Sequence, residues 1–347
     1  MSNMGLKTFR IVIIGFGSVG RAFARVLALK RKMIEDKYGV VLSVVGVADS
    51  KGMAVKYEGF TEYELLKLSE VPRSGVNLFV PYAYSYADLK YMYDAVQPDI
   101  HIELTPANYI NGEPGLSNIT FALSRGVHVV TANKAPLVLK FKELMNLARS
   151  KKISIRFRST VMGGTPLIDM IMSLKSEDIE RIDGILNATT NFILTEMHEK
   201  LIDFDEALKR AQAMGIAEAD PTLDIDGVDA AAKLVILSYV IGHELKLDEV
   251  ERESLSKVKL RDVVEAFKEG YTIKYIASLD VQGRKASVKI SRISRNDVFA
   301  QINGTLNAVR IRSNTGDLFF VGKGGGGVET AHSVLDDVLA IALSSER

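Results

Sequence analysis

The sequence predicts a doubly wound α/β domain followed by a smaller α+β domain. Over the first third of the chain, short runs rich in valine and isoleucine alternate with helical patterns, and after about residue 150 the alternation becomes irregular. Continuous apolar strands separated by helices are typical of a parallel sheet covered on both faces. A length of 347 residues also exceeds one ordinary core. We therefore expect domains at residues 1–150 and 151–310, with a C-terminal segment, 311–347, that returns to the first domain.

Each predicted element follows from the periodicity of its apolar residues. In the first domain we expect strands at 9–14, 40–48, 99–104 and 127–131, and helices at 19–36, 86–96, 116–125 and 140–151. In the second we expect a helix near 165–174, a strand near 181–188, helices at 191–214, 227–245 and 259–269, and strands at 274–283 and 285–293. A glycine run that begins at Gly322 leads into a last helix.

The composition excludes several classes of function. With 44 basic and 43 acidic residues, the net charge favours neither nucleic acid nor a membrane surface. The chain has no cysteine, which excludes disulfides and thiolate metal sites and fits a reducing setting. No signal peptide or membrane-spanning stretch is recognised, so we expect a cytoplasmic protein. The histidines lack ligand spacing and are interpreted as structural: His101, His128, His198, His243 and His332.

A glycine loop follows the first predicted strand, in FRIVIIGFGSVG. Gly15 permits a tight turn, Gly17 lets the backbone approach a pyrophosphate, and Gly20 lets the next helix pack on the sheet. The helix N-terminus adds free amides and a partial positive charge. The alternative, a glycine turn without a ligand, is disfavoured by the flanking strand and helix. The loop therefore predicts a Rossmann-type site for NAD or NADP.

The second strand ends at Asp49, which we expect to hold the ribose of the cofactor. Lys51 follows closely and would attract a 2′-phosphate, so the choice between NAD and NADP stays open. The same four residues, Asp-Ser-Lys-Gly, are also ordinary turn chemistry.

Polar residues follow two other strands of the predicted sheet. Thr105, Pro106 and Asn108 follow one, and Thr131, Asn133 and Lys134 end and follow the other. In open α/β sheets, ligands bind outside the carboxyl ends of the strands. Lys134 is therefore a candidate for the place where nicotinamide and substrate meet, against the alternative of a surface lysine.

An acidic segment, GIAEADPTLDIDGVDAAAK, leads into a very apolar helix that carries Lys233. We expect Asp226 or Gly227 to open this helix, with Asp226 as a suitable N-cap, and Asp229 and Lys233, four residues apart, to lie on one face. An exposed ion pair is the ordinary interpretation. Because the helix is apolar nearly all round, we instead expect a buried lysine, which must be paired. The cluster predicts a small substrate with an amino group and a lysine acid/base catalyst.

These motifs together resemble the homoserine dehydrogenases, in the short form without a C-terminal regulatory domain. The matching stretches are IVIIGFGSVG, ELTPANYINGEPG, HVVTANKAPL, GGTPLI, GILNATTNFILTEM, GIAEADPTLDIDGVDAAAK and GKGGGGVETAHSVLDD. The resemblance implies reversible NAD(P)-dependent oxidation of L-homoserine to L-aspartate 4-semialdehyde, on the route to threonine and methionine. It also implies a homodimer built through the second domain, and no threonine feedback through a regulatory domain.

The resemblance also assigns roles to residues. Lys233 is the expected proton donor, and Lys134 adjoins both nicotinamide and substrate. The expected substrate-binding residues are Glu218, Asp224, Asp229 and Thr189. Resemblance and glycine loop together give the cofactor-binding set Gly15, Phe16, Gly17, Ser18, Val19, Gly20, Asp49, Lys51, Thr105, Lys134 and Gly326. Of the other acids in the segment, Asp220 and Asp226 are expected to be turn and cap residues.

The chain departs from the family pattern at two places. Arg158 stands where the family usually has a glutamate that helps to hold a sodium ion, which leaves the backbone carbonyls of Val161 and Gly163 as the ligands of a monovalent cation. Ala188 replaces a usual glycine, which narrows the backbone's approach to substrate. Two alternatives stay open: a related amino-acid or semialdehyde dehydrogenase, and a catalytically silent dinucleotide-binding protein.

Overall fold

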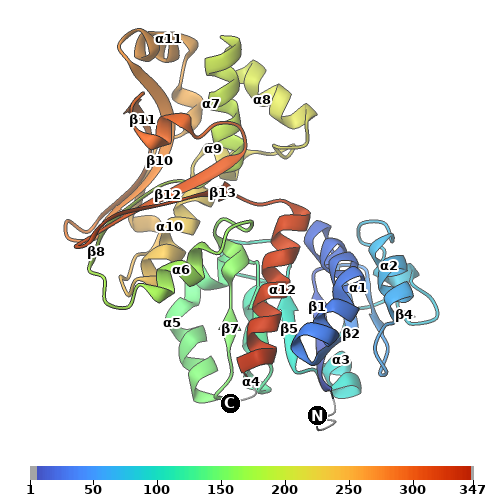
Figure 1. The fold of residues 1–347 in the computed structure, drawn as a ribbon. Helices are drawn as coiled ribbons and strands as arrows, with labels where there is room; N and C mark the ends of the chain where they lie inside the picture. The colour runs from blue at the N-terminus through green and yellow to red at the C-terminus, as the bar shows by residue number, and fades with distance from the viewer. Residues whose placement is uncertain (1–5, 345–347) are drawn as a thin grey trace. The chain divides into compact units, whose positions relative to one another are not determined.

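The computed structural model describes residues 6–344, and the chain forms two compact units, each described by itself (Figure 1). The first unit comprises Met1–Thr160 and Gly326–Arg347, and the second comprises Val161–Gly325. The first unit therefore continues past the predicted boundary at 150, and the second unit continues past the predicted boundary at 310. Residues beyond 150 still add a strand to the first sheet, and residues 306–323 form two strands of the second sheet.

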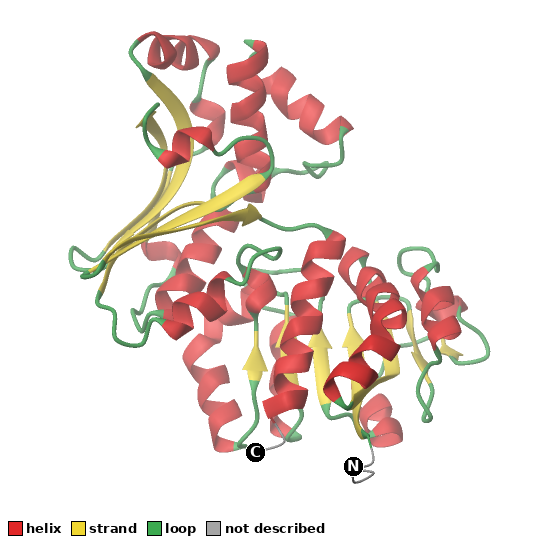
Figure 2. Cartoon of the chain, viewed as in Figure 1, coloured by secondary structure: helices red, strands yellow, loops and turns green. Residues whose placement is uncertain are grey.

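The first unit is built on a seven-stranded sheet in the order β4-β3-β2-β1-β5-β6-β7. Figure 2 draws the strands in yellow. The strands are β1 Lys7–Ile14, β2 Val40–Asp49, β3 Gly52–Val55, β4 Ala83–Tyr84, β5 Ile100–Glu103, β6 His128–Thr131 and β7 Ile155–Arg156. The neighbouring strands in the stretch β2-β1-β5-β6-β7 of this sheet all run parallel, which confirms the predicted α/β class. The antiparallel strands β3 and β4, at one edge, were not predicted.

Helices cover the sheet of the first unit. They are α1 Ser18–Tyr38, α2 Glu62–Ser69, α3 Leu89–Val96, α4 Gly115–Ser124, α5 Lys134–Ser150 and α12 Gly327–Ser344, with the 3-10 turns η1 Val76–Leu78 and η2 Arg158–Thr160. The C-terminal helix α12 lies beside α1 (Figure 1), and both share a buried apolar core with β1 and β2. Residues from the two ends of the chain thus build one core.

Helix α5 begins six residues before the predicted position, at Lys134 rather than 140. The Asn133 side chain caps it by accepting a hydrogen bond from the amide of Ala135 at 3.2 Å. Pro136 lies in the first turn, where its missing N–H costs nothing. Pro136 is therefore compatible with a helix that begins at Lys134, and the predicted start at 140 was too late.

The second unit is built on a six-stranded sheet in the order β13-β12-β8-β10-β11-β9. The strands are β8 Ile179–Ile185, β9 Val250–Arg252, β10 Tyr271–Asp280, β11 Lys285–Ser294, β12 Leu306–Ser313 and β13 Gly316–Lys323. The helices are α6 Leu167–Ser173, α7 Ala188–Lys200, α8 Phe204–Ala213, α9 Thr222–Ile225, α10 Val228–Val240 and α11 Leu260–Lys268, with 3-10 turns η3 Leu247–Glu249, η4 Leu255–Lys257 and η5 Val298–Gln301. All pairings are antiparallel except that of β9 with β11.

Two helix predictions in the second unit are wrong. The single helix expected over 191–214 is two helices, because Leu201 takes a left-handed conformation with φ of 52° and ends α7. The cap of α10 is Gly227, with φ of 74°, rather than Asp226, which ends the short helix α9. Within residues 6–344, no helix has the length and apolarity needed to cross a membrane.

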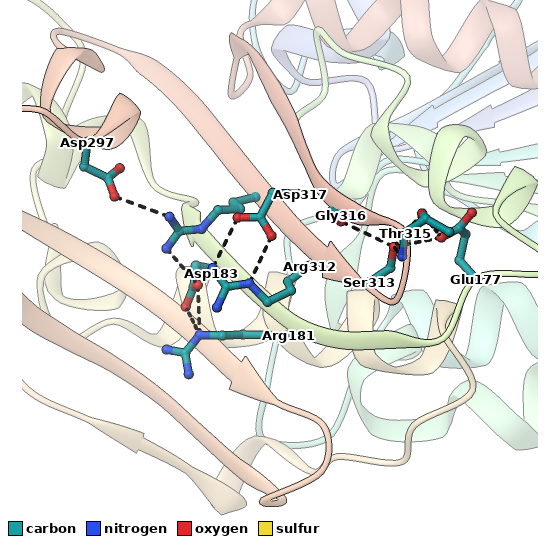
Figure 3. Close-up of polar contacts among 10 residues, drawn as sticks. Glu177, Arg181, Asp183, Asp297, Arg312, Ser313, Thr315, Gly316 and Asp317 are labelled. Atoms are coloured by element: carbon teal, nitrogen blue, oxygen red, sulfur yellow. Dashed lines mark hydrogen bonds and ion pairs between the residues drawn. The ribbon is translucent and has the colours of Figure 1, made fainter.

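Ion pairs connect the strands near one edge of the second sheet (Figure 3). The buried Asp183 on β8 accepts from Arg181 at 2.9 Å and from Arg310 on β12 at 3.2 Å. Arg312 on β12 pairs with Asp317 on β13 at 3.0 Å. Burial alone would raise the pKa of Asp183, but hydrogen bonds from Arg181 and Ser278 outweigh it and hold the pKa below its usual value. The network fixes β8, β12 and β13 side by side.

Candidate active site

A cavity of about 500 Å³ opens at the carboxyl ends of β1, β2 and β5 in the first unit. Its wall includes the predicted residues Gly15, Phe16, Gly17, Asp49 and Thr105. This is the edge of a parallel sheet at which ligands bind. The cavity therefore lies where the glycine loop predicts a dinucleotide.

Each loop glycine has a distinct steric reason. Gly15 has φ of 96°, and a Cβ there would lie 2.4 Å from the carbonyl carbon of Leu104. A Cβ on Gly20 would lie 2.8 Å from the Gly15 oxygen, so only glycine lets α1 approach the loop this closely. A Cβ on Gly17 would meet nothing within 4 Å, which leaves room for a ligand at the backbone. These contacts fit a bound pyrophosphate.

The C-terminal glycine run lies against the start of α1. A Cβ on Gly327 would lie 2.8 Å from Ser18 Oγ. Gly17 is the N-cap of α1 and makes no side-chain cap hydrogen bond, so the first-turn amides keep no side-chain acceptor. Ser18 and Val19 begin this helix, and Gly326 precedes α12 with φ of 128°. The predicted cofactor residues from both ends of the chain therefore lie near one loop.

Asp49 lines the cavity, but its carboxylate is also used locally. Oδ1 accepts from the amides of Lys51 at 2.8 Å and Gly52 at 3.2 Å, and Oδ2 accepts from the amide of Val76 at 3.0 Å. The turn interpretation of this acid is therefore confirmed. Lys51 is absent from the cavity wall, and Arg73 is present in it. Sequence reasoning missed Arg73, because nothing in its neighbourhood marks a ligand.

The two other polar strand ends contact each other. Asn133 Nδ2 donates to Thr105 Oγ1 at 3.2 Å, across β5 and β6. Lys134 is the first residue of α5 and is half-buried. Pro106 lines the cavity, whereas the Asn108 side chain accepts from the amide of Ile110 and forms a turn.

In the second unit, Lys233 is buried within a polar cluster. Its Nζ lies 2.8 Å from Asp229 Oδ2 and donates to the carbonyl oxygen of Leu186 at 2.5 Å. The two side chains are 9% and 17% exposed, so a buried lysine pairs with a half-buried aspartate, and this is not an ordinary surface ion pair. Asn187 Nδ2 donates to Asp224 at 2.7 Å and to Asp229 at 2.9 Å. The GILNATTN segment and the acidic segment thus meet in one polar cluster.

The other predicted substrate residues differ in position. Thr189 is buried, donates to the carbonyl of Ile216 at 3.2 Å, and contacts Asp224. Glu218 is exposed, and its backbone carbonyl accepts from Gln212 at 3.2 Å. Asp220 accepts from the Thr222 hydroxyl at 2.6 Å, which confirms its role in a turn.

Sequence reasoning did not single out Asn187, which belongs to the same polar cluster. It joins Asp224 and Asp229 and also caps α7, since Oδ1 accepts from the amide of Thr190 at 2.9 Å. Ala188, the departure from the usual glycine, is the first residue of α7. The GILNATTN motif signalled a site here, but the partners of Asn187 lie 37 and 42 residues away along the chain.

Replacing Asp224 by asparagine is expected to stabilise the protein at neutral pH. Burial, and then the Asp229 carboxylate, raise the pKa of Asp224 above its usual value. Ionisation of Asp224 is therefore less favourable in the folded than in the unfolded chain, and stability is lost as the pH rises through the folded-state pKa. We expect the melting temperature of Asp224→Asn to exceed that of the wild type by roughly 2–4 °C at pH 7, the effect of about 1 kcal/mol. The gain should vanish in acid below the ordinary aspartate pKa. A gain independent of pH would contradict this account.

Arg158 takes part in an ion-pair cluster within the first unit. Its Nη1 lies 2.7 Å from Asp336 on α12, and its amide donates to the buried Asp337 at 2.8 Å. Arg156 also pairs with Asp337, at 3.0 Å. In the second unit, the amide of Gly163 donates to the carbonyl of Gly324 at 3.1 Å.

Comparison with known proteins identifies the family. Residues 15–158 match the family model for the homoserine dehydrogenase NAD binding domain, and residues 166–339 match the homoserine dehydrogenase model. The homoserine dehydrogenase of Sulfurisphaera tokodaii is 36% identical, over 96% of this chain and 98% of its own length. The NAD(+)-dependent homoserine dehydrogenase of Pseudomonas canavaninivorans is 34% identical, over 99% of this chain and 98% of its own.

A solved structure is similar over almost the whole length. The structure of a hyperthermophilic archaeal homoserine dehydrogenase in complex with NADPH has a TM-score of 0.83 and 33% identity, and the match covers 97% of this chain and 98% of that one. Motifs, fold and both family models agree. The chain belongs to the homoserine dehydrogenase family and is an NAD(P)-dependent oxidoreductase.

Proposed function

We propose that this homoserine dehydrogenase binds the amino-acid part of its substrate at the cluster of Asn187, Asp224, Asp229 and Lys233. The observation that carries the proposal is a buried ammonium beside two carboxylates that share one asparagine. The α-ammonium group of homoserine is a suitable partner for such carboxylates, since charge-assisted hydrogen bonds are the strong ones. Glu218 and Thr189 complete the proposed pocket.

Lys233 is the proposed acid/base. When the aldehyde is reduced, its Nζ gives a proton to the oxygen of the developing alkoxide, and in the reverse direction it takes the proton of the homoserine hydroxyl. A cation at this oxygen also stabilises the charge that appears in the transition state. The nicotinamide cofactor supplies or accepts the hydride. Lys134, at the start of α5, is proposed to adjoin the nicotinamide and the substrate.

Removal of the substrate's amino group tests the proposed pocket. We expect 4-hydroxybutyrate, which is homoserine without the α-amino group, to be oxidised with a kcat/KM about 10–100-fold lower. A hydrogen bond to a charged group contributes about 1.5–3 kcal/mol. The measurement is the absorbance of the reduced nicotinamide with each substrate at saturating cofactor. Equal kcat/KM for the two substrates would contradict an amino-group pocket made by the carboxylates.

The cofactor is proposed to lie in the cavity of the first unit. The pyrophosphate would meet the amides at Gly15 to Gly20, with Phe16, Ser18 and Val19 around it, and Gly326 would lie near it from the C-terminal run. Thr105 would contact the nicotinamide side. Support comes from the room at Gly17 and the free helix N-terminus. The related proteins include one named as NAD(+)-dependent and one solved with NADPH.

Arg73 is proposed to hold the 2′-phosphate when the cofactor is NADPH. It lines the cavity with Asp49, whereas Lys51 does not. We expect Arg73→Ala to raise the KM for NADPH roughly 10–50-fold, in line with the loss of a charge-assisted pair. The KM for NADH should change less than twofold, and Lys51→Ala serves as the matched control. Equal effects on both cofactors, or a larger effect of Lys51→Ala, would contradict the assignment.

The residues do not fit a monovalent cation held as in the wider family. Arg158 takes the place of the usual glutamate, so this position offers a guanidinium, paired with Asp336, where the family offers a carboxylate ligand. Among residues 6–344, no group of three or more His, Asp or Glu side chains is placed to hold a metal. The backbone carbonyls of Val161 and Gly163 are then the remaining candidate ligands, and no step of the mechanism is assigned to a cation.

A homodimer formed through the second unit is also proposed. The edge strand β13 carries the exposed apolar side chains Leu318, Phe319 and Val321. An exposed edge of this kind is suited to pairing with another chain. The cysteine-free composition supports a cytoplasmic location.

A further inference from the structure

A buried polar chain lies behind the cavity of the first unit. His101 and Glu103, both on β5, are 0% exposed. The Tyr93 hydroxyl lies 2.9 Å from His101 Nδ1, and His101 Nε2 lies 3.4 Å from Glu103 Oε2. Because an ionised carboxylate only accepts, Nε2 carries the imidazole proton and Tyr93 donates to Nδ1. His101, which was interpreted from the sequence as structural, thus belongs to a series of hydrogen bonds that runs from Tyr93 to Glu103.

Glu103 also holds the wall of the cavity. It accepts from the amide of Thr105 at 2.8 Å, from the Thr105 hydroxyl, and from Asn118 Nδ2 at 2.9 Å. Both Thr105 and Asn118 line the cavity. Thr105 Oγ1 in turn accepts from Asn133, which caps the helix that begins with Lys134. The buried Glu103 carboxylate therefore connects Thr105 and Asn118 directly, and Asn133 through Thr105, at the proposed cofactor site.

The acid fixes the orientation of these groups. Since Glu103 only accepts, Asn118 must turn its nitrogen toward Glu103, which leaves its carbonyl oxygen as an acceptor for a ligand. The Thr105 hydroxyl must donate to Glu103, so toward other groups it is an acceptor. A buried carboxylate is costly, and a site beside a ligand cavity is where such a cost is retained.

We propose that Glu103 is a positioning residue for the nicotinamide cofactor, acting through Thr105 and Asn118. It sets both side chains as acceptors for donor groups of the cofactor, such as ribose hydroxyls or the carboxamide N–H. This inference rests on the proposed cofactor site in the same cavity. Replacement by glutamine keeps the shape but places an N–H₂ group against donors, so Asn118 or Thr105 must reorient.

The test is titration of the whole protein with NADPH and NADH, followed by the fluorescence of the reduced nicotinamide. We expect Glu103→Gln to raise the Kd at least tenfold. The double variant with Asn118→Leu should bind no more weakly than the weaker single variant, because coupled residues are non-additive. The matched control is Tyr93→Phe. It removes a buried hydroxyl that bonds His101, at the end of the hydrogen-bonded series farthest from Glu103, and should change the Kd less than twofold.

A purely structural role would give a different pattern. Glu103→Gln would then lower the melting temperature while the Kd changed less than twofold, or its effect would add to that of Asn118→Leu; either result overturns the proposal. If Glu103→Gln does not fold, Asn118→Leu alone decides, since a Kd unchanged within twofold removes the group through which Glu103 acts. Gly17→Val tests the cavity itself. If that variant binds both cofactors like the wild type, the cofactor site is wrong, which is distinguishable from failure at Glu103 alone.

Discussion

Replacing Lys233 by methionine is expected to lower kcat about 10²–10⁴-fold, the usual contribution of a positioned acid or base. Methionine keeps the length and the apolar stem of the side chain but removes the only ammonium in the cluster that can reach both Asp229 and the Leu186 carbonyl. The proton that must reach the alkoxide then has no donor at this position. Steady-state rates in both directions at saturating cofactor measure the effect.

A second buried lysine supplies the matched control. Lys274 on β10 is 1% exposed, and its Nζ donates to the Ile302 carbonyl and to Asn303 at 2.9 Å. Lys274→Met removes the same group from the same unit and leaves comparable acceptors unpaired, so both variants should lose stability. Only Lys233→Met should lose kcat beyond tenfold. Equal losses in the two variants would mean that burial, and not chemistry, explains the effect.

The change Asp229→Asn is expected to lower kcat/KM for homoserine about 10²–10³-fold. Asparagine keeps an oxygen for the Asn187 bond, but the buried Lys233 ammonium loses its ion-pair partner at 2.8 Å. An unpaired buried charge costs about 3–5 kcal/mol, and the substrate ammonium loses an acceptor as well. We expect a raised KM together with a lower kcat, since both substrate and lysine depend on this carboxylate.

Two neighbouring acids provide controls for the net charge of the segment. Asp220 forms a turn with Thr222, and Asp226 is exposed at the end of α9. Asp220→Asn and Asp226→Asn change the charge of the same segment by the same amount and should alter kcat/KM less than threefold. If either one equals Asp229→Asn, the effect belongs to the overall charge and not to the pair with Lys233.

The first unit was largely predictable because its strands are buried on both faces and read as continuous apolar runs. The runs at 9–14 and 40–48 became β1 and β2, which are longer by only a few residues. Strands β3 and β4 are four and two residues long, too short to show a periodic pattern of apolar residues. Strands β12 and β13 were missed because neither shows a clear alternation of polar and apolar residues: β12 is mostly buried between two strands, and β13 is an exposed edge strand.

The polar cluster around Lys233 was predictable where its residues lie within one short segment of the sequence. The burial and pairing of Lys233 followed from an apolar helix with a carboxylate four residues earlier. Asn187, Arg73 and Glu103 were not singled out as site residues. Asn187 and Glu103 bond side chains that only the fold brings close, and Arg73 lies in a cavity wall. Neither property is visible in the local sequence. Asp226 does not cap α10, because Gly227, in a left-handed conformation, is the N-cap of this helix.

The most direct test of the proposed chemistry is a single turnover. Wild-type, Lys233→Met and Lys274→Met proteins with bound NAD(P)H are mixed rapidly with L-aspartate 4-semialdehyde, and the absorbance of the reduced nicotinamide is followed. The account predicts that oxidation of the nicotinamide slows at least 100-fold in Lys233→Met, in line with the loss of a general acid, and less than tenfold in Lys274→Met. A Lys233→Met protein that oxidises its nicotinamide as fast as the wild type would contradict the assignment of Lys233 as the proton donor.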